Sequence, residues 1–140
     1  MKVAVVFWSG TGNTEMMASA VADGIKQAGG EAATFTAAEF SSDMVNEYDS
    51  IAFGCPAMGD ETLEEGEFEP MFTSVESSLS GKKVGLFGSY GWGDGQWMRD
   101  WEQNVISDGA VMAAEPVICN DAPDDDAKNA CIALGKALVG

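Results

Sequence analysis

Short apolar runs alternate along this chain with longer segments of helical periodicity, and this alternation limits the possible folds more than any other feature. The run Val3–Trp8 is continuous and rich in β-branched residues, as expected for a strand buried on both faces. The same criteria predict four further strands, at residues 32–36, 51–55, 84–88 and 111–119. The segments between them predict helices after the first Gly-rich turn and at 67–79, 96–107 and 127–138, with a short helix or loop at 40–48.

Strands that alternate with helices are typical of βαβ units and a parallel sheet. We therefore expect a three-layer α/β/α domain with a five-stranded parallel sheet. Pro116 falls inside the last predicted strand, and proline lacks the N–H that a central strand needs, so this strand should lie at an edge. The strand order 2-1-3-4-5 meets that condition. Ligands of such sheets bind beyond the carboxyl ends of the strands, so the loops after strands 1, 3 and 4 are the candidate site.

Length and charge exclude several classes of protein. The 140 residues predict one domain spanning 1–140. There are 7 Lys and Arg against 23 Asp and Glu, which gives a formal net charge of −16, and nucleic acids and anionic membranes repel such a chain. The absence of His excludes Ser-His, Cys-His and zinc-His sites. An apolar fraction of 46% is high enough for a folded core.

The cysteines and the first residues bear on the compartment. Cys55, Cys119 and Cys131 are odd in number and form no C-x-x-C pair, so we expect reduced, packed thiols and no metal site. The apolar run at the start is too short for a signal peptide, and no run is long enough to span a membrane. These features predict a cytoplasmic protein.

The loop after strand 1 has the composition of a phosphate-binding loop. It reads Ser9-Gly10-Thr11-Gly12-Asn13-Thr14 and leads directly into a predicted helix. Glycines let backbone N–H groups converge on a ligand, and a helix N-terminus adds partial positive charge. The loop matches neither the P-loop nor the Rossmann fingerprint. A plain strand-to-helix turn is the structural alternative, since Gly and Thr are common there.

The two other loops carry aromatic and sulfur-containing side chains. Pro56-Ala57-Met58-Gly59-Asp60-Glu61 follows strand 3, and Ser89-Tyr90-Gly91-Trp92-Gly93-Asp94 follows strand 4. Trp92 between glycines is suited to stack on a flat ligand, with the Met58 thioether on its other face. Capping of the sheet end by Tyr90 and Trp92 is the alternative. Trp97 and Trp101 lie on the following helix, and core packing is the better prediction for at least Trp101, as it is for the pair Met16-Met17.

Taken together, these three motifs resemble those of the short-chain flavodoxins, which are FMN-carrying electron-transfer proteins. The motifs are Ser-Gly-Thr-Gly-Asn-Thr at 9–14, Ala-Met-Gly-Asp-Glu at 57–61 and Ser-Tyr-Gly-Trp-Gly-Asp-Gly at 89–95. The resemblance extends over essentially the whole chain and implies the flavodoxin-like fold. Pro56 stands where some members carry a small hydroxyl residue, and proline offers neither a hydroxyl nor an N–H.

The resemblance also implies roles for individual residues. The loop 9–14 would bind the FMN phosphate, Trp92 would stack on the outer face of the flavin and Met58 would flank the inner face. The backbone at Gly59-Asp60 would switch on reduction, and Glu61 would bond the N3 side of the ring. The segment 89–94 would line the ring or the ribityl chain. The complete set of expected FMN-binding residues is Ser9, Gly10, Thr11, Gly12, Asn13, Thr14, Pro56, Ala57, Met58, Gly59, Asp60, Glu61, Ser89, Tyr90, Gly91, Trp92, Gly93 and Asp94.

The acidic residues are concentrated in three groups that we assign to the carboxyl end of the sheet. One group follows Met58 and runs from Asp60 to Glu76, Asp94 lies in the Trp92 loop, and the third spans 121–126. A solvated acidic face is one interpretation. The other is that these charges lower the flavin potential and steer basic patches on redox partners toward the protein.

Two functions on this fold are compared. The first is a low-potential one-electron carrier, not an enzyme, that shuttles non-covalent FMN between semiquinone and hydroquinone for partner enzymes and is a monomer. The second is an FMN-dependent NAD(P)H quinone or azo reductase, which needs a second substrate pocket. A receiver domain of the same fold is excluded because Ser9-Gly10 and Cys55 stand where that family needs acids.

Overall fold

The computed structural model describes residues 1–59 and 61–140. Its strands are β1 (Lys2–Phe7), β2 (Glu31–Thr36), β3 (Ser50–Gly54), β4 (Lys83–Tyr90), β5 (Val111–Met112) and β6 (Val117–Asn120). Its α-helices are α1 (Asn13–Gln27), α2 (Phe68–Val75), α3 (Gln96–Ser107) and α4 (Asp125–Val139). Three short 3₁₀ helices are η1 (Ala37–Glu39), η2 (Ser42–Glu47) and η3 (Glu76–Ser78), the last continuing α2.

The sheet has the predicted strand order, β2-β1-β3-β4-β5, and all of its pairs are parallel. The prediction of a single fifth strand over 111–119 is wrong. That strand is split in two: β5 pairs with the start of β4, and β6 pairs with its end, where Phe87 lies opposite Val117. Pro116 lies in the gap between them. Proline has no N–H to donate to a neighbouring strand, and the edge of the sheet tolerates this loss.

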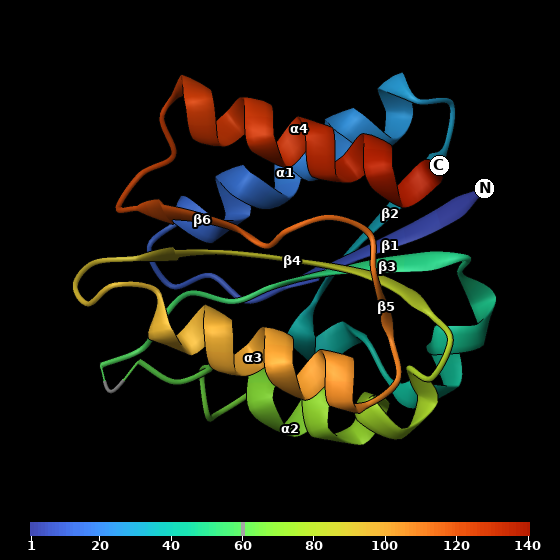
Figure 1. The fold of residues 1–140 in the computed structure, drawn as a ribbon, viewed down its shortest axis with the longest axis horizontal. Coiled ribbons are helices and arrows are strands. Elements are labelled where there is room, and N and C mark those ends of the chain that lie inside the picture. The colour runs from blue at the N-terminus through green and yellow to red at the C-terminus, as the bar shows by residue number, and fades with distance from the viewer. Residues whose placement is uncertain (60) are drawn as a thin grey trace.

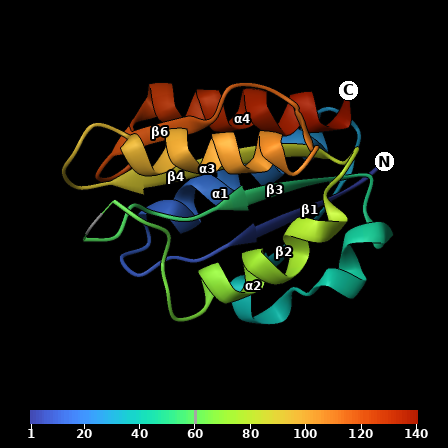
Figure 2. The ribbon, with the colours of Figure 1, turned by 60° about the horizontal axis from the view of Figure 1, so that its bottom comes forward.

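Helices cover both faces of the sheet, as predicted. Figures 1 and 2 show α1 and α4 on one face and α2 and α3 on the other. Each face has its own apolar core. Trp101 is buried in the core on the α2–α3 side, which confirms the prediction of core packing, and Trp97 is buried there too. The Met16-Met17 pair is divided, since Met17 is buried and Met16 is 42% exposed.

The helices α1 and α4 approach each other closely because glycines face across their interface. A Cβ on Gly24 would collide with the carbonyl oxygen of Ile132, and one on Gly135 would collide with that of Val21. Only glycine leaves space for this contact between backbones. The packing fixes the axis of α1 and therefore the position of its N-terminus, which begins directly after the loop at 9–12.

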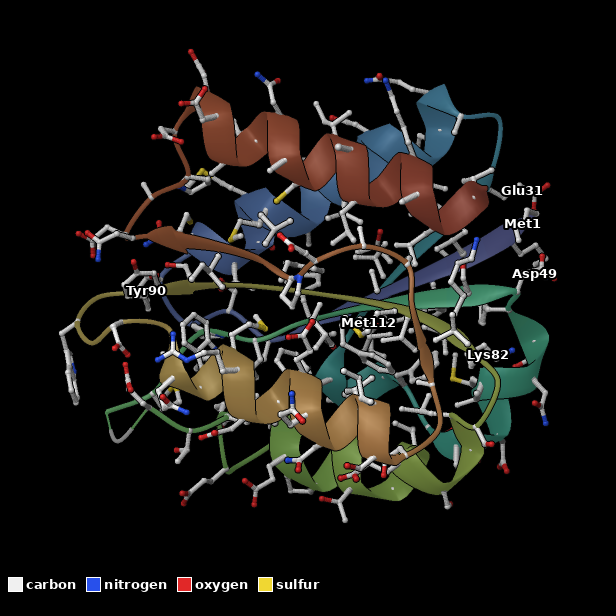
Figure 3. All side chains as sticks on the ribbon, viewed as in Figure 1. Met1, Glu31, Asp49, Lys82, Tyr90 and Met112 are labelled. Atoms are coloured by element: carbon white, nitrogen blue, oxygen red, sulfur yellow. The ribbon has the colours of Figure 1, made fainter. Side chains whose placement is uncertain are left out.

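The parallel topology places the amino ends of the strands and the carboxyl ends of the helices at one edge of the sheet. Five of the basic residues lie in, or directly beside, elements that start or end there: Lys2, Lys26, Lys82, Lys83 and Lys136. Figure 3 shows Lys82, Glu31 and Asp49 at this amino edge and Tyr90 at the opposite, carboxyl edge. Glu76 follows α2 and therefore lies at the amino edge, so its assignment to the carboxyl end of the sheet was wrong.

Glu76 forms a carboxyl pair with Asp108, which follows α3. Burial raises the pKa of Glu76 to about 7, and the hydrogen bond and negative charge of Asp108 add to this effect. The Oδ2 atom of Asp108 is buried and has no other donor among the described residues. A proton on Glu76 would supply the missing donor, and loss of that proton would leave two carboxyl groups near each other without it.

This pair predicts a specific pH dependence of stability. Because the folded state raises the pKa of Glu76 above its ordinary value of 4.5, the folded state binds more protons than the unfolded state between pH 4.5 and about 7. The pair's contribution to the free energy of unfolding therefore falls as pH rises through this range. At pH 8 we expect Glu76→Gln to be more stable than the wild type by about 1 kcal/mol, after allowing for solvent screening.

Chemical denaturation at pH 4 and pH 8 measures this effect. At pH 4 the two proteins should have nearly equal free energies of unfolding. Glu69→Gln, which removes an exposed acid in the first turn of α2, is the comparison variant and should gain no stability at pH 8. A Glu76→Gln variant that is less stable than the wild type at pH 8 would contradict the protonated-pair interpretation.

Candidate functional site

The three candidate loops meet in one cavity of about 250 Å³ at the carboxyl edge of the sheet. Its lining includes residues from the loops after β1, β3 and β4, together with the end of β6. The lining residues are Trp8, Gly10, Thr11, Asn13, Pro56, Ala57, Met58, Ser89, Tyr90, Gly91 and Asp121. All of them except Trp8 and Asp121 belong to the set predicted from the sequence.

The loop after β1 presents polar groups at the start of α1. The Ser9 hydroxyl oxygen accepts hydrogen bonds from the amides of Gly12 (3.1 Å) and Glu15 (3.3 Å). Gly12 has φ 96°, a left-handed conformation that explains the need for glycine at this position. Ser9 and Gly12 line a second hollow of about 370 Å³ beside the cavity. The loop is therefore wrapped around the positive end of the helix.

Thr14 provides an unpaired polar atom in the first turn of α1. Its side chain is 1% exposed, and its hydroxyl has no hydrogen-bond partner among the described residues. A buried hydroxyl without a partner is costly, and such groups usually mark a place where a ligand or water completes the bonding. The sequence predicted Thr14 as a phosphate ligand, and the buried hydroxyl is consistent with that role.

The loop after β3 is a closed turn held at both ends. The Ala57 amide donates to the Ser89 carbonyl (3.0 Å), which attaches the loop to β4. Within the turn, the Met58 amide donates to the Thr62 carbonyl (3.0 Å), and the Glu61 amide donates to the Met58 carbonyl (2.8 Å). Within this turn, Glu61 has a left-handed φ of 53°. The predicted site residue Asp60 lies outside the described residues.

The start of this turn is fixed from below by a buried side chain. The Nε1 atom of Trp97 donates a hydrogen bond to the Cys55 carbonyl (3.1 Å). A Cβ on Gly88 would collide with that same carbonyl oxygen, so glycine allows the end of β3 to approach β4. Trp97 therefore has a structural role in the site, although it does not line the cavity.

The loop after β4 extends into solvent. Trp92 is 63% exposed and, like Gly93 and Asp94, lies outside the cavity lining. Gly59 and Glu61 also lie outside the lining. Tyr90 lines the cavity and also packs its ring against Trp97, with centroids 5.6 Å apart, so it does cap the sheet end. Stacking of Trp92 on a flat ligand stays a prediction.

Two lining residues were not predicted. Trp8 was assigned to the first strand, but β1 ends at Phe7, and the Trp8 ring lies against Gly10, where a Cβ would leave it little space. Asp121 was treated only as part of an acidic group. Its carbonyl accepts a hydrogen bond from the Ser89 hydroxyl (2.8 Å), and its amide donates to the Tyr90 carbonyl (2.8 Å). Position immediately after a strand was the signal that could have identified both.

The thiol beside the site is chemically inert. Burial raises the pKa of Cys55 to about 12, so the thiol stays neutral at ordinary pH. Burial also raises the pKa of Cys119. A neutral thiol is neither a nucleophile nor a metal ligand, and the chain has no His to activate it. The chemistry of this edge therefore depends on hydrogen-bond donors, aromatic rings and a thioether.

Glu64 has a structural role that the sequence did not suggest. Its carboxylate accepts hydrogen bonds from the amides of Gly66 (2.8 Å), Glu67 (2.7 Å) and Phe68 (2.8 Å), at the start of α2. Burial acts to raise the pKa of this carboxyl, but the three amide bonds together lower it below its ordinary value. The carboxylate of Glu67 accepts a bond from Trp8 Nε1 (3.3 Å). Part of the acidic surface thus stabilises the loops.

These features define a doubly wound α/β protein with a phosphate-type loop and an aromatic loop at the same edge. The family described as Flavodoxin matches residues 5–135. The flavodoxin of Clostridium beijerinckii is 47% identical over 135 residues, which cover 96% of this chain and 97% of that protein. The flavodoxin of Megasphaera elsdenii is 44% identical over 137 residues and 98% of each chain. This chain belongs to the flavodoxin family.

Comparison with solved structures agrees. The solution structure of two-electron reduced Megasphaera elsdenii flavodoxin has a TM-score of 0.90 and 44% identity, with 98% of each chain covered. A flavodoxin from the domain Archaea has a TM-score of 0.86 at 26% identity. The chain is an FMN-binding electron carrier of the flavodoxin family. In the described parts of the chain, no helix is long and apolar enough to cross a membrane.

The hydrogen bonds of Glu64 predict a loss of stability when they are removed. We expect Glu64→Ala to lower the free energy of unfolding by about 1 kcal/mol at pH 7, because three amides at a helix start lose their acceptor. Since the folded state lowers the pKa of Glu64, this contribution is present above pH 4.5 and is lost as pH falls through the folded pKa.

Thermal and urea unfolding at pH 7 and pH 3 measure the difference. Glu65→Ala is the matched control, because Glu65 is the exposed neighbour of Glu64 and its substitution removes the same charge. An equal loss of stability in the two variants would show that charge, and not hydrogen bonding, is responsible.

Proposed function

We propose that residues 1–140 form one domain that holds FMN non-covalently at the carboxyl-edge cavity and acts as a low-potential, one-electron carrier. The observation that carries this proposal is the meeting of the phosphate-type loop, Met58 and the Ser89–Gly91 segment around one cavity. The proposed binding residues are those of the three loops predicted from the sequence, with Trp8 and Asp121 added.

The phosphate of FMN would be held by neutral donors. The loop offers the hydroxyls of Ser9, Thr11 and Thr14, together with the partial positive charge of the α1 N-terminus. The buried Thr14 hydroxyl would gain the acceptor that it lacks among the described residues. This donor set fits one stably bound monophosphate.

The flavin ring would lie between the loops after β3 and β4. Met58 lines the cavity and would contact one face with its thioether, while the exposed Trp92 would cover the other by stacking. The Met58–Thr62 turn would respond to reduction through its backbone. A Cβ on Gly59 would meet open space, so the surroundings leave room for the backbone of this turn to change.

Bound FMN supplies a ring system that accepts and releases electrons one at a time. The protein would hold the ring at the surface, and a carrier needs no pocket for a second substrate. The reductase alternative is not favoured by the family comparisons. Among the described residues, the cavity lining also contains no Lys or Arg that would pair with the phosphates of a nicotinamide cofactor.

Reductive titration of the purified full chain tests the proposal. We expect a yellow protein that binds FMN in a 1:1 ratio and passes through a one-electron-reduced flavin when reductant is added stepwise. Thr14→Val should raise the FMN dissociation constant by about tenfold, because one hydrogen bond to a charged phosphate is lost. Thr73→Val, an exposed threonine on α2, is the matched control.

Two results would contradict the proposal. A chain that binds no added FMN would overturn the cofactor assignment. A chain that oxidises NAD(P)H in the presence of quinone with repeated turnover would instead support the reductase.

The remaining acids at the carboxyl edge would steer redox partners with basic patches toward the flavin. Glu65 is exposed there, and so is the cluster at 124–126, although Asp124 also caps α4; five of the seven basic residues lie at the amino edge. Such polarity speeds encounter with cationic surfaces and slows encounter with anionic ones. We propose that the carrier is a monomer and cytoplasmic. The three free cysteines are consistent with a reducing compartment.

Electron transfer to small oxidants measures this steering without a natural partner. We expect Glu65→Lys to slow reduction of the cationic hexaammineruthenium(III) complex by about twofold and to speed reduction of anionic ferricyanide. Glu47→Lys, the same reversal at the amino edge, should change neither rate. Equal effects of the two reversals, or rates independent of ionic strength, would contradict steering by the carboxyl edge.

A further inference from the structure

Arg99 makes three hydrogen bonds, two to Asp94 in the loop after β4 and one to Gln96 at the start of its own helix, α3. Its Nη1 atom donates to the backbone carbonyl of Asp94 (3.0 Å), and its Nη2 atom donates to Asp94 Oδ1 (3.0 Å) and to Gln96 Oε1 (2.8 Å). The guanidinium thus bonds both the main chain and the side chain of one loop residue. The planar guanidinium group of arginine can donate several hydrogen bonds in this geometry, whereas the single ammonium group of a lysine cannot.

Asp94 is also held from its other side. Its amide donates a hydrogen bond to Glu61 Oε1 (3.0 Å), from the turn that follows β3. Asp94 therefore has its amide, its carbonyl and its carboxylate all bonded. Through this residue the Met58–Thr62 turn and the Trp92 loop are connected, although neither Glu61 nor Asp94 lines the cavity.

The helix dipole does not explain the position of Arg99. Arg99 lies near the N-terminus of α3, where the helix dipole disfavours a cation, and the first turn carries no acid. Its side chain and that of Asp94 are both exposed, so an isolated ion pair here would contribute little. The bond to a main-chain carbonyl is the feature that distinguishes this contact from an ordinary surface pair.

We propose that Arg99 is a positioning residue for the flavin site. It fixes Asp94, and the Asp94 amide in turn orients the Glu61 carboxylate and joins the two loops that would flank the ring. One oxygen of Glu61 makes this bond, so the other stays available to the ligand. The proposal rests on the proposed FMN site, but the loop connection exists in the protein itself and is measurable there.

Amide hydrogen exchange at Asp94, followed by NMR on the full chain with and without FMN, tests the connection directly. We expect Arg99→Lys and Arg99→Gln each to speed exchange of this amide by about threefold to fivefold, because the lysine keeps the charge but loses the planar guanidinium group. Lys128→Gln is the matched control. It removes one exposed cation from a helix that starts at the same edge, and it should leave the exchange rate unchanged.

FMN binding and the flavin potential separate positioning from charge. If Arg99 positions the loops, Arg99→Lys should raise the FMN dissociation constant by about threefold and shift the potential, whereas Lys128→Gln should change the affinity by less than 1.5-fold. Asp94 exchange at the wild-type rate in both Arg99 variants would overturn the proposal. So would wild-type affinity and potential in Arg99→Lys.

Failure of the proposed function gives a different result. A chain that binds no FMN would refute the cofactor assignment, while the exchange measurement on that same chain would still show whether Arg99 holds Asp94. Faster Asp94 exchange together with unchanged FMN affinity would mean that the connection exists but does not serve the flavin, and would overturn the positioning role.

Discussion

The parallel pairing of β1, β3 and β4 is the constraint on which the site depends. Parallel strands end at the same edge, so the strand pairing alone brings together three loops that are far apart in the sequence. The approach of β3 to β4 is close enough that glycine is required at position 88, and Trp97 Nε1 holds the carbonyl at the end of β3. Buried packing thus sets the geometry of an exposed site.

Helix direction explains part of the charge distribution. All four α-helices start at the carboxyl edge, and acids in their first turns include Glu15, Glu69 and Asp125, while Lys26 and Lys136 lie in last turns. Each of these placements is favourable to the helix dipole. The acidic carboxyl edge is therefore partly a consequence of stabilising the helices. An acid without such a role, such as Glu65, would act only in attracting redox partners.

The sequence predicted the fold and the cavity well, for identifiable reasons. The alternation predicted a parallel sheet, one proline agreed with the strand order that is observed, and the bounds of the helix at 96–107 agree with α3. Strong periodicity and glycine-rich turns are local signals, and they survive in the tertiary structure. The break in the last strand was missed because a proline shows where a ladder bond is lost but not how far the chain then departs from the sheet.

Side-chain roles were less predictable than positions. Glu64, Glu65 and Glu67 looked equivalent in the sequence, yet Glu64 bonds three amides, Glu67 accepts from Trp8 and Glu65 is exposed. Composition gives the number of charges but not their hydrogen-bond partners, which depend on how the turn before α2 closes. The same limit applied to Trp8 and Asp121, since each follows a strand whose end only the sheet register defines.

The site combines rigid and adjustable parts, and their arrangement follows from burial. The phosphate-type loop is anchored by the packing of α1 against α4, where glycines permit contact between backbones. The loops that would flank the ring are held instead by exposed hydrogen bonds, such as that between Asp94 and Glu61. Exposed bonds are weaker than core packing and reform readily, so a carrier built this way can retain its cofactor by the phosphate while the protein around the ring adjusts to the charge that the ring carries.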